Sequence, residues 1–394
     1  MTLFRLMLAY WRAKPLAVTL TLASFALGIG TIALLLIGAA SLERTAAREA
    51  KGIDLVVGAK GSPIQLVLSS VFHVDVPTGN IPLDEAERLS RHPMVRKAMP
   101  LALGDSVDGH RIVGTSEAYP AHYGARLAEG RYWREPMEAV LGAQVARHDN
   151  AKVGEKFVGA HGVVGSGPAH ADHPYSVVGI LAPTGTVIDR LVLTSVESVW
   201  DVHAEHRTQA ATPGPREITA LLISYRGPIA AATLPREINA RTALQAASPA
   251  YEMARLFAVF GVALDVLRAF AGALILGAGL GVFATLTAAL DARRFDLAVL
   301  RALGATRGRV FGLVLMEGLA SAILGAALGL ALAHLAAEIV GRTVAEGLID
   351  GATWVEGELW LVALALGIGG AAALVPALRA YRSDVASVLA LRRG

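Results

Sequence analysis

A group of histidines in the middle of the chain is the most obvious candidate for chemistry. His203 and His206 stand one helical turn apart, and Asp172 lies between two further histidines. Imidazoles near a carboxylate suit zinc, copper or nickel, and a chain without cysteine has no thiolate ligand to offer. The candidate metal ligands, with zinc as the candidate ion, are His161, His170, His173, His203 and His206.

Two other interpretations of these histidines remain open. They lie in a tract rich in glycine and proline, and the sequence does not fix their distances in the fold, so the simpler interpretation is a polar loop with incidental histidines. A loop whose charge responds to pH is the third interpretation, because histidine titrates near neutral pH.

Recognisable catalytic motifs are missing from the sequence. The patterns G-x-S-x-G, H-E-x-x-H and Walker A do not occur. The stretch from Gly58 to Ser62 has the composition of a phosphate cradle, but its spacing differs from G-x-x-x-x-G-K-[ST]. Exposed carboxylates are common, so we expect solvated surface, not acid and base pairs, at Asp105, Asp108, Glu135 and Glu138. We therefore predict no catalytic residue, no bound cofactor and no enzymatic activity in this chain.

Glu317 is a different kind of candidate, because it lies inside an otherwise apolar run. A charge at the centre of a bilayer costs about 2.5 to 3.5 kcal/mol even on the gentler insertion scale, so an intramembrane acid is a functional candidate. It follows Arg309 by about two helical turns, which places it toward the inner end of the run. We expect a structural or coupling role for it and no contact with a substrate.

The composition indicates that membrane spans and a soluble domain together position these residues. Of 394 residues, 54% are hydrophobic and 18% are charged, and the mean hydropathy is +0.50. These values are too apolar for an ordinary soluble domain and too charged for a protein made only of spans. The net charge of +3 is small and the arginines gather at span ends, which favours membrane lipid as a partner over nucleic acid.

Four apolar runs are long enough to cross a bilayer, which takes about 20 helical residues. The first run is longer than the core of a secretory signal, about 7 to 15 residues, so we expect an uncleaved span. The predicted segments are 1–14 (cytoplasmic), 15–40 (first span), 41–251 (extracytoplasmic domain with stalk helices), 252–290 (stalk and second span), 291–309 (cytoplasmic loop with a short helix), 310–335 (third span), 336–358 (outer loop), 359–378 (fourth span) and 379–394 (cytoplasmic tail).

Arginine placement orients these segments, because short loops rich in arginine stay on the cytoplasmic side. Both termini are therefore predicted to be cytoplasmic and residues 41–251 to be outside. Within 41–251, strands mixed with helices indicate an α+β domain of two lobes, with 152–183 as an inserted β-rich lobe. We predict helices at 83–92 and 228–240 and strands at 95–103, 111–114, 139–142, 192–194, 218–224 and 243–245.

The loop between the second and third spans has a helical pattern of its own. Apolar residues recur at helical spacing from Phe295 to Leu303, and Gly304 supplies a stop. We predict a short helix along the membrane surface. In the neighbouring spans, Gly277 with Gly281 and Gly325 with Gly329 have the spacing that lets helices approach closely, although glycine is also common in spans generally.

The sequence RRFDLAVLRALGA from Arg293 resembles the cytoplasmic coupling segment of the MacB/FtsX-type (type VII) ABC transporter permeases, which include the lipoprotein-releasing permeases. The sequences IVGTSEAY near Ile112, EAVLGAQVA from Glu138 and YSVVGILAPTGTVIDRLVLTSVESV from Tyr175 are similar to the MacB-type periplasmic domain in the same order. PALRAYRSDVASVLALR, near the end, resembles the family's terminal signature, so the resemblance covers the whole chain.

This resemblance implies a permease subunit in a bacterial inner membrane whose coupling segment docks on a separate ABC ATPase. ATP and magnesium would be bound by that ATPase, and two permease copies, identical or different, would share an ATPase dimer. Mechanotransmission to the periplasmic domain would then serve export, efflux or lipoprotein release, with a periplasmic or lipoprotein partner. The residues implied to couple to the ATPase are Arg293, Arg294, Phe295, Asp296, Leu297, Val299, Leu300, Arg301, Leu303 and Gly304.

Two alternatives from other functional classes remain. One is a regulator that transports nothing and switches an extracytoplasmic partner. The other is a metal-handling membrane protein that uses the histidine tract.

Overall fold

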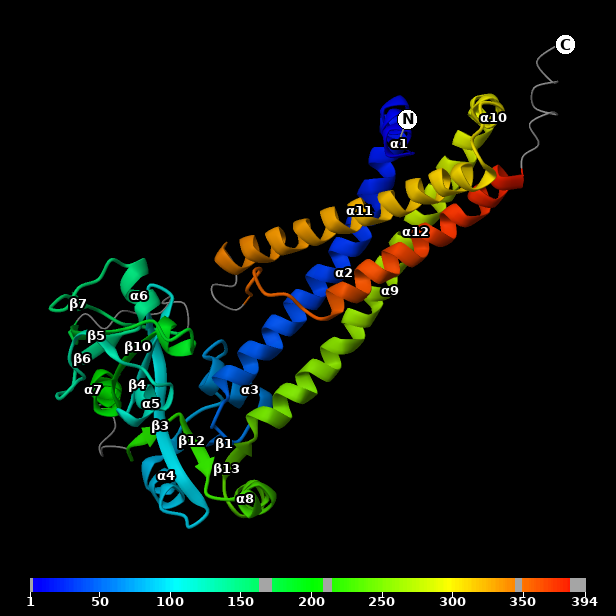
Figure 1. Ribbon diagram of the computed structural model, residues 1–394. Coiled ribbons are helices and arrows are strands. Elements are labelled where there is room, and N and C mark those ends of the chain that lie inside the picture. The colour runs from blue at the N-terminus through cyan, green and yellow to red at the C-terminus, as the bar shows by residue number, and fades with distance from the viewer. Residues whose placement is uncertain (1–2, 163–171, 208–214, 344–348, 383–394) are drawn as a thin grey trace. The chain divides into compact units, whose positions relative to one another are not determined.

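Four long apolar helices and a large mixed sheet make up the computed structural model, which describes residues 3–162, 172–207, 215–343 and 349–382 (Figure 1). Met1–Arg44 and Val259–Gly394 form the helical unit, and Thr45–Ala258 forms the α+β unit. The predicted fold class, four spans with an α+β domain between the first and the second, is confirmed. His170 and the end of the predicted tail, 383–394, lie outside the described residues.

Each of the four long helices has the length and composition to cross a membrane. They are α2 (Pro15–Glu49), α9 (Pro249–Ala292), α11 (Arg307–Thr343) and α12 (Gly357–Arg382). The helical unit also holds α1 (Leu3–Ala13) and α10 (Arg294–Ala302). With 35 and 44 residues, α2 and α9 are longer than a bilayer requires, and both helices continue in sequence from one unit into the other.

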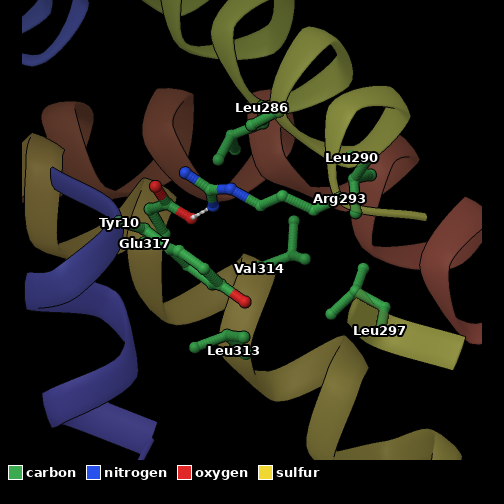
Figure 2. Close-up of a pocket in the computed structure, with 9 residues that line it drawn as sticks. Tyr10, Leu286, Leu290, Arg293, Leu297, Leu313, Val314 and Glu317 are labelled. Carbon is green, nitrogen blue, oxygen red and sulfur yellow. Dashed lines mark ion pairs between the residues drawn. The ribbon is translucent and has the colours of Figure 1, made fainter. Parts of the chain in front are cut away.

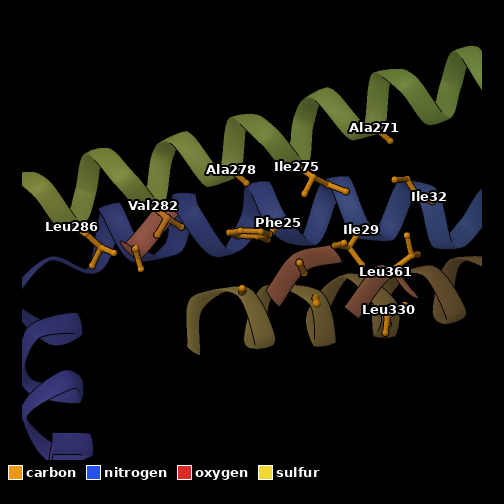
Figure 3. Close-up of a cluster of buried hydrophobic side chains, with 14 of the residues drawn as sticks. Phe25, Ile29, Ile32, Ala271, Ile275, Ala278, Val282, Leu286, Leu330 and Leu361 are labelled. Atoms are coloured by element: carbon orange, nitrogen blue, oxygen red, sulfur yellow. The ribbon is translucent and has the colours of Figure 1, made fainter. Parts of the chain in front are cut away.

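All four long helices contribute to the core of the helical unit (Figure 3). Phe25 and Ile29 of α2 and Ile275 of α9 are fully buried in one cluster with Leu330 of α11 and Leu361 of α12. Alanines fill much of the rest of this cluster. Small residues let helix backbones approach closely. In a membrane the lipid tails are as apolar as the side chains, so helices associate through this close packing and not through the hydrophobic effect.

Two glycines of α11 bring this helix against α2. A Cβ atom on Gly329 would lie 2.7 Å from the carbonyl oxygen of Ala26, and one on Gly325 would lie 2.5 Å from a side-chain atom of α2. The spacing of this pair therefore does reflect close helix packing. A Cβ on Gly277 or Gly281 would meet nothing within 4 Å, so that pair does not join two of the described helices.

The α+β unit is built on a mixed sheet that has eleven strands among the described residues. Its main path is β13-β1-β12-β3-β4-β10-β6-β9-β5, with β7 paired to β9 and β8 paired to β3, and β2 and β11 form a separate pair. The strands are β1 (Leu55–Ala59), β2 (Ile81–Pro82), β3 (Val95–Val107), β4 (His110–Thr115), β5 (Leu127–Gly130), β6 (Glu138–Leu141), β7 (Lys156–Phe157), β8 (Ala160–His161), β9 (Tyr175–Leu181), β10 (Leu191–Ser195), β11 (Glu217–Ile218), β12 (Ala220–Tyr225) and β13 (Leu244–Ala247).

Both faces of this sheet are covered. Val56 of β1 packs into one buried cluster while its neighbours Leu55 and Val57 pack into another, because successive side chains of a strand point to opposite faces. The helices of the unit are α3 (Pro63–Val67), α4 (Leu83–Ser90), α5 (Ala118–His122), α6 (Ala143–His148), α7 (Val196–Arg207) and α8 (Pro228–Arg241), with single turns at Leu68–Phe72 and Val187–Arg190.

The predicted helices and strands of this unit are observed within a few residues of their expected bounds. The inserted lobe is different. Residues 152–183 supply β7, β8 and β9, and these strands pair with β3, β5 and β6. The described residues of the two expected lobes therefore share one sheet.

Glu138 corrects the expectation of a solvated carboxylate at the start of β6. Its Oε2 accepts a hydrogen bond of 2.7 Å from Nη1 of Arg131, and Nη2 of Arg131 contacts Oε1. The backbone N–H groups of Arg134 and Glu135 donate to the same carboxylate. The Arg131 side chain, helped by these N–H groups, lowers the pKa of Glu138 to about 2, so the carboxylate ties a turn together in its charged form.

Candidate functional site

The short helix α10 has one buried face and one exposed face. Leu297 and Ala298 are buried, at 6% and 4% exposure, and Leu297 belongs to the core cluster of the helical unit. Phe295 and Leu303 are 37% and 80% exposed. The predicted helix between the second and third spans is therefore present, and two large apolar side chains remain accessible, Phe295 on the helix and Leu303 at its C-terminal cap.

The end of α10 is fixed by Gly304, as the sequence predicted. Gly304 has a φ of +99°, in the left-handed region that glycine adopts without strain. Its N–H donates to the carbonyl of Arg301, and the N–H of Ala305 donates to the carbonyl of Leu300. This pair of hydrogen bonds is the Schellman arrangement, which satisfies the last carbonyl groups of a helix.

The start of α10 is held by a buried ion pair. Nη1 of Arg293 lies 3.7 Å from Oε2 of Glu317 in α11, and the two side chains are only 13% and 10% exposed (Figure 2). The guanidinium of Arg293 also lies 3.5 Å from the centre of the Tyr10 ring, within the range of a cation–π contact. One arginine therefore connects α1, the start of α10 and α11.

Apolar side chains surround this ion pair (Figure 2). They come from α9, α10 and α11 and shield the two charges from water. The lining residues, besides Tyr10, Arg293 and Glu317, are Leu286, Ala289, Leu290, Leu297, Leu313 and Val314. Glu317 is thus an acid inside an apolar helix that pairs with a cationic side chain, and its structural or coupling role stays a prediction.

The residues expected to couple to an ATPase fall into separate sets. Arg293 and Leu297 point into the helical unit and anchor α10. Phe295, Asp296 and Leu303 are exposed. Val299, Leu300 and Arg301 are half-buried, Gly304 ends the helix, and the side chain of Arg294 lies outside the described residues.

The histidine tract is only partly brought together. His161 of β8 and His203 of α7 meet at Asp105 of β3, with ligand atoms that all lie within 4.8 Å of one another. Asp105 was expected to be solvated surface, but it is only 3% exposed, which corrects that expectation. His173 is half-buried just before β9, and the side chain of His206, like His170, lies outside the described residues.

His334 and Glu358 form a pair that sequence reasoning did not single out. Nδ1 of His334 lies 2.6 Å from the carbonyl oxygen of Gly351, and Nε2 lies 3.0 Å from Oε2 of Glu358. Glu358 is the last residue of the predicted outer loop, 336–358, yet it is fully buried. A single histidine inside an apolar run was the available signal, because such a residue needs a polar partner.

Comparison with protein families gives two matches. The model for the MacB-like periplasmic core domain matches residues 18–241, more than half of the chain, and the model for the FtsX-like permease C-terminal region matches residues 268–385. A comparison with curated protein sequences gives no significant match.

Two solved structures resemble the chain over about half its length. The periplasmic region of MacB from Actinobacillus actinomycetemcomitans is 14% identical, with a TM-score of 0.34, over 52% of this chain and 95% of that one. The extracellular domain of the noncanonic ABC-type transporter YknZ from Gram-positive bacteria is 11% identical, with a TM-score of 0.29, over 49% of this chain and 98% of that one. These TM-scores are too low to support an argument, so the assignment depends on the family models. Because those models match both the α+β unit and the later spans, this chain belongs to the MacB/FtsX-type family of ABC transporter permeases.

Proposed function

We propose that this permease is driven by a separate ABC ATPase that binds the exposed face of α10 from the cytoplasm. The observation that carries the proposal is the two-sided character of α10. Phe295 and Leu303 offer apolar surface to a partner, while Leu297 and Arg293 fix the helix to the rest of the helical unit. A force applied to α10 would therefore be felt by the spans that anchor it.

The proposed mechanism begins on the partner, which binds ATP and magnesium. Closure of two ATPase subunits on nucleotide displaces α10, and the Arg293–Glu317 pair makes α1 and α11 move with it. α2 and α9 continue without a break into the α+β unit, so they are the covalent route by which motion reaches that unit. Paired ATPase sites require two permease copies. The output is movement of the extracytoplasmic domain that serves export, efflux or lipoprotein release.

The clustering of basic residues supports the orientation that this proposal needs. Arg301, Arg307 and Arg309 lie on α10 or at the start of α11, and Arg379 and Arg382 lie at the end of α12. Short segments rich in arginine usually remain in the cytoplasm, which supports a cytoplasmic position for α10, within reach of an ATPase.

A Leu303→Asp variant tests the docking face. A charge in the centre of an apolar contact should remove about 2 kcal/mol or more of binding energy, which is the loss typical of an interface hot spot. We expect at least a tenfold decrease in the ABC ATPase that copurifies with the detergent-solubilised chain, measured as nucleotide hydrolysis in the purified fraction.

The matched control is Val74→Asp, the same kind of change at a residue of the α+β unit that is 56% exposed. It should leave copurification unchanged. The Leu303→Asp variant must melt at the same temperature as the unaltered chain. If the two then copurify with equal amounts of ATPase, α10 is not the docking site.

A further inference from the structure

A second site lies in the α+β unit, where β3, β8 and α7 bring one carboxylate and two imidazoles together. Asp105 and His161 stand directly opposite each other in the β3–β8 pair. His203 reaches the same point from α7. The register between β3 and β4 shifts between Leu103 and Ser106, the interval that contains Asp105. Such an irregularity changes the direction in which the side chains of a strand point.

The donor distances fit a metal ion better than direct hydrogen bonds. Nδ1 of His161 lies 3.3 Å from Oδ1 of Asp105, and Nε2 of His203 lies 3.3 Å from Oδ2. Hydrogen bonds from nitrogen to oxygen are usually about 2.9 to 3.0 Å long, and shorter when charge-assisted. In a tetrahedral zinc site with bonds of about 2.0 to 2.2 Å, neighbouring donor atoms are about 3.3 to 3.5 Å apart.

Burial adds to this geometry. Asp105 is 3% exposed, and burying a carboxylate is costly unless a positive charge or hydrogen bonds compensate it. The hydroxyl of Tyr175 is also buried, without a hydrogen-bond partner among the described residues. A bound divalent cation would compensate the carboxylate directly.

Hydrogen bonds hold the strands of the site together, and its histidines can be reached from solvent. β8 is fastened to β3 by a 2.6 Å hydrogen bond from Oγ of Ser106 to the carbonyl of Gly162 and by one of 3.0 Å from the N–H of Gly162 to the carbonyl of Gly104. His203 lines a cleft together with Gly104 and Thr219, and the side chains of His161 and His203 are 32% and 25% exposed, so solvent reaches both imidazoles.

We propose that Asp105, His161 and His203 form a site for a divalent transition metal ion of zinc type. Two imidazoles and one carboxylate are a donor set that zinc uses when three ligands come from the protein and a fourth position stays open. The site belongs to the α+β unit alone, so it does not depend on whether an ATPase binds α10.

The test uses the full-length chain in detergent, freed of metal with a chelator and titrated with zinc chloride by calorimetry. We expect one zinc ion per chain, and at least a tenfold loss of affinity in each of His161→Ala and His203→Ala. Cobalt chloride should give the visible absorption bands of a tetrahedral site with nitrogen and oxygen ligands, and both variants should lose them.

His148→Ala is the matched control. His148 lies in a second, more exposed group with His110 and Asp149, and its Nδ1 is 2.7 Å from Oδ1 of Asp149, an ordinary hydrogen-bond length. This variant should bind zinc like the unaltered chain. If a histidine-to-alanine variant has a lower melting temperature than the unaltered chain when both are free of metal, the His203→Gln variant is titrated instead. The proposal is wrong if the unaltered chain binds no zinc, or if folded variants at His161 and His203 bind it unchanged.

Discussion

An Arg293→Ala variant is expected to lose about 3 to 5 kcal/mol of stability in the helical unit, the usual cost of removing one partner from a buried ion pair. Glu317 would remain with 10% of its side chain exposed among leucine and valine side chains. The variant would also lose the contact between Arg293 and the Tyr10 ring. Thermal unfolding of the detergent-solubilised chain, followed by circular dichroism, measures the loss, and nucleotide hydrolysis by the copurified ATPase should no longer respond to the permease.

Two further variants separate this effect from a general loss of positive charge. Arg309→Ala removes an arginine from the exposed start of α11 and should change stability by less than about 0.5 kcal/mol, as is usual for surface substitutions. The double variant Arg293→Ala with Glu317→Gln should recover part of the stability, because no uncompensated charge remains buried. If the Arg293→Ala and Arg309→Ala variants have the same melting temperature, the ion pair does not anchor α10.

A Gly329→Val variant should separate α11 from α2. Its Cβ would lie 2.7 Å from the carbonyl oxygen of Ala26 and 3.0 Å from the backbone nitrogen of Gly30, and backbone atoms cannot yield as a flexible side chain can. Overpacking of this kind costs about 1 to 3 kcal/mol and sometimes more. We expect a clear fall in melting temperature and in the yield of monodisperse protein.

Gly281→Val is the matched change on α9, where a Cβ meets nothing within 4 Å among the described residues. This variant should stay close to the unaltered chain in melting temperature. A similar fall in melting temperature at both positions would mean that valine destabilises these helices through its low helix propensity. The contact between α2 and α11 would then not explain the effect.

Local patterns in the sequence were sufficient to predict the elements. Four apolar runs gave the four helices, and the helical spacing that includes Ala298 together with Gly304 gave α10 and its end. Such features depend on residues only a few positions apart, which is the range over which hydrophobic periodicity and capping act. The strands of the α+β unit were predicted for the same reason.

Contacts between distant elements could not be predicted in this way. Arg293 belongs to an arginine-rich segment that looks cytoplasmic, and only the packing of α1 and α11 turns it inward to Glu317. Asp105 looked like a surface acid because its sequence neighbours are turn residues, whereas the pairing of β8 with β3 and the position of α7 bury it. His334 and Glu358 lie on two helices separated by a loop. The partner of a buried charge depends on tertiary structure, and a short stretch of sequence does not determine that structure.

Site-directed crosslinking from α10 tests the proposed docking most directly. The chain has no cysteine, so Leu303→Cys and Glu356→Cys each create a unique thiol, the first on the exposed face of α10 and the second in the segment before α12. With a short thiol-to-amine crosslinker in native membranes, the proposal predicts that residue 303 crosslinks to an ABC ATPase and that residue 356 does not. Labelling of residue 303 by a membrane-impermeant thiol reagent in intact cells, with no crosslink to an ATPase, would contradict it.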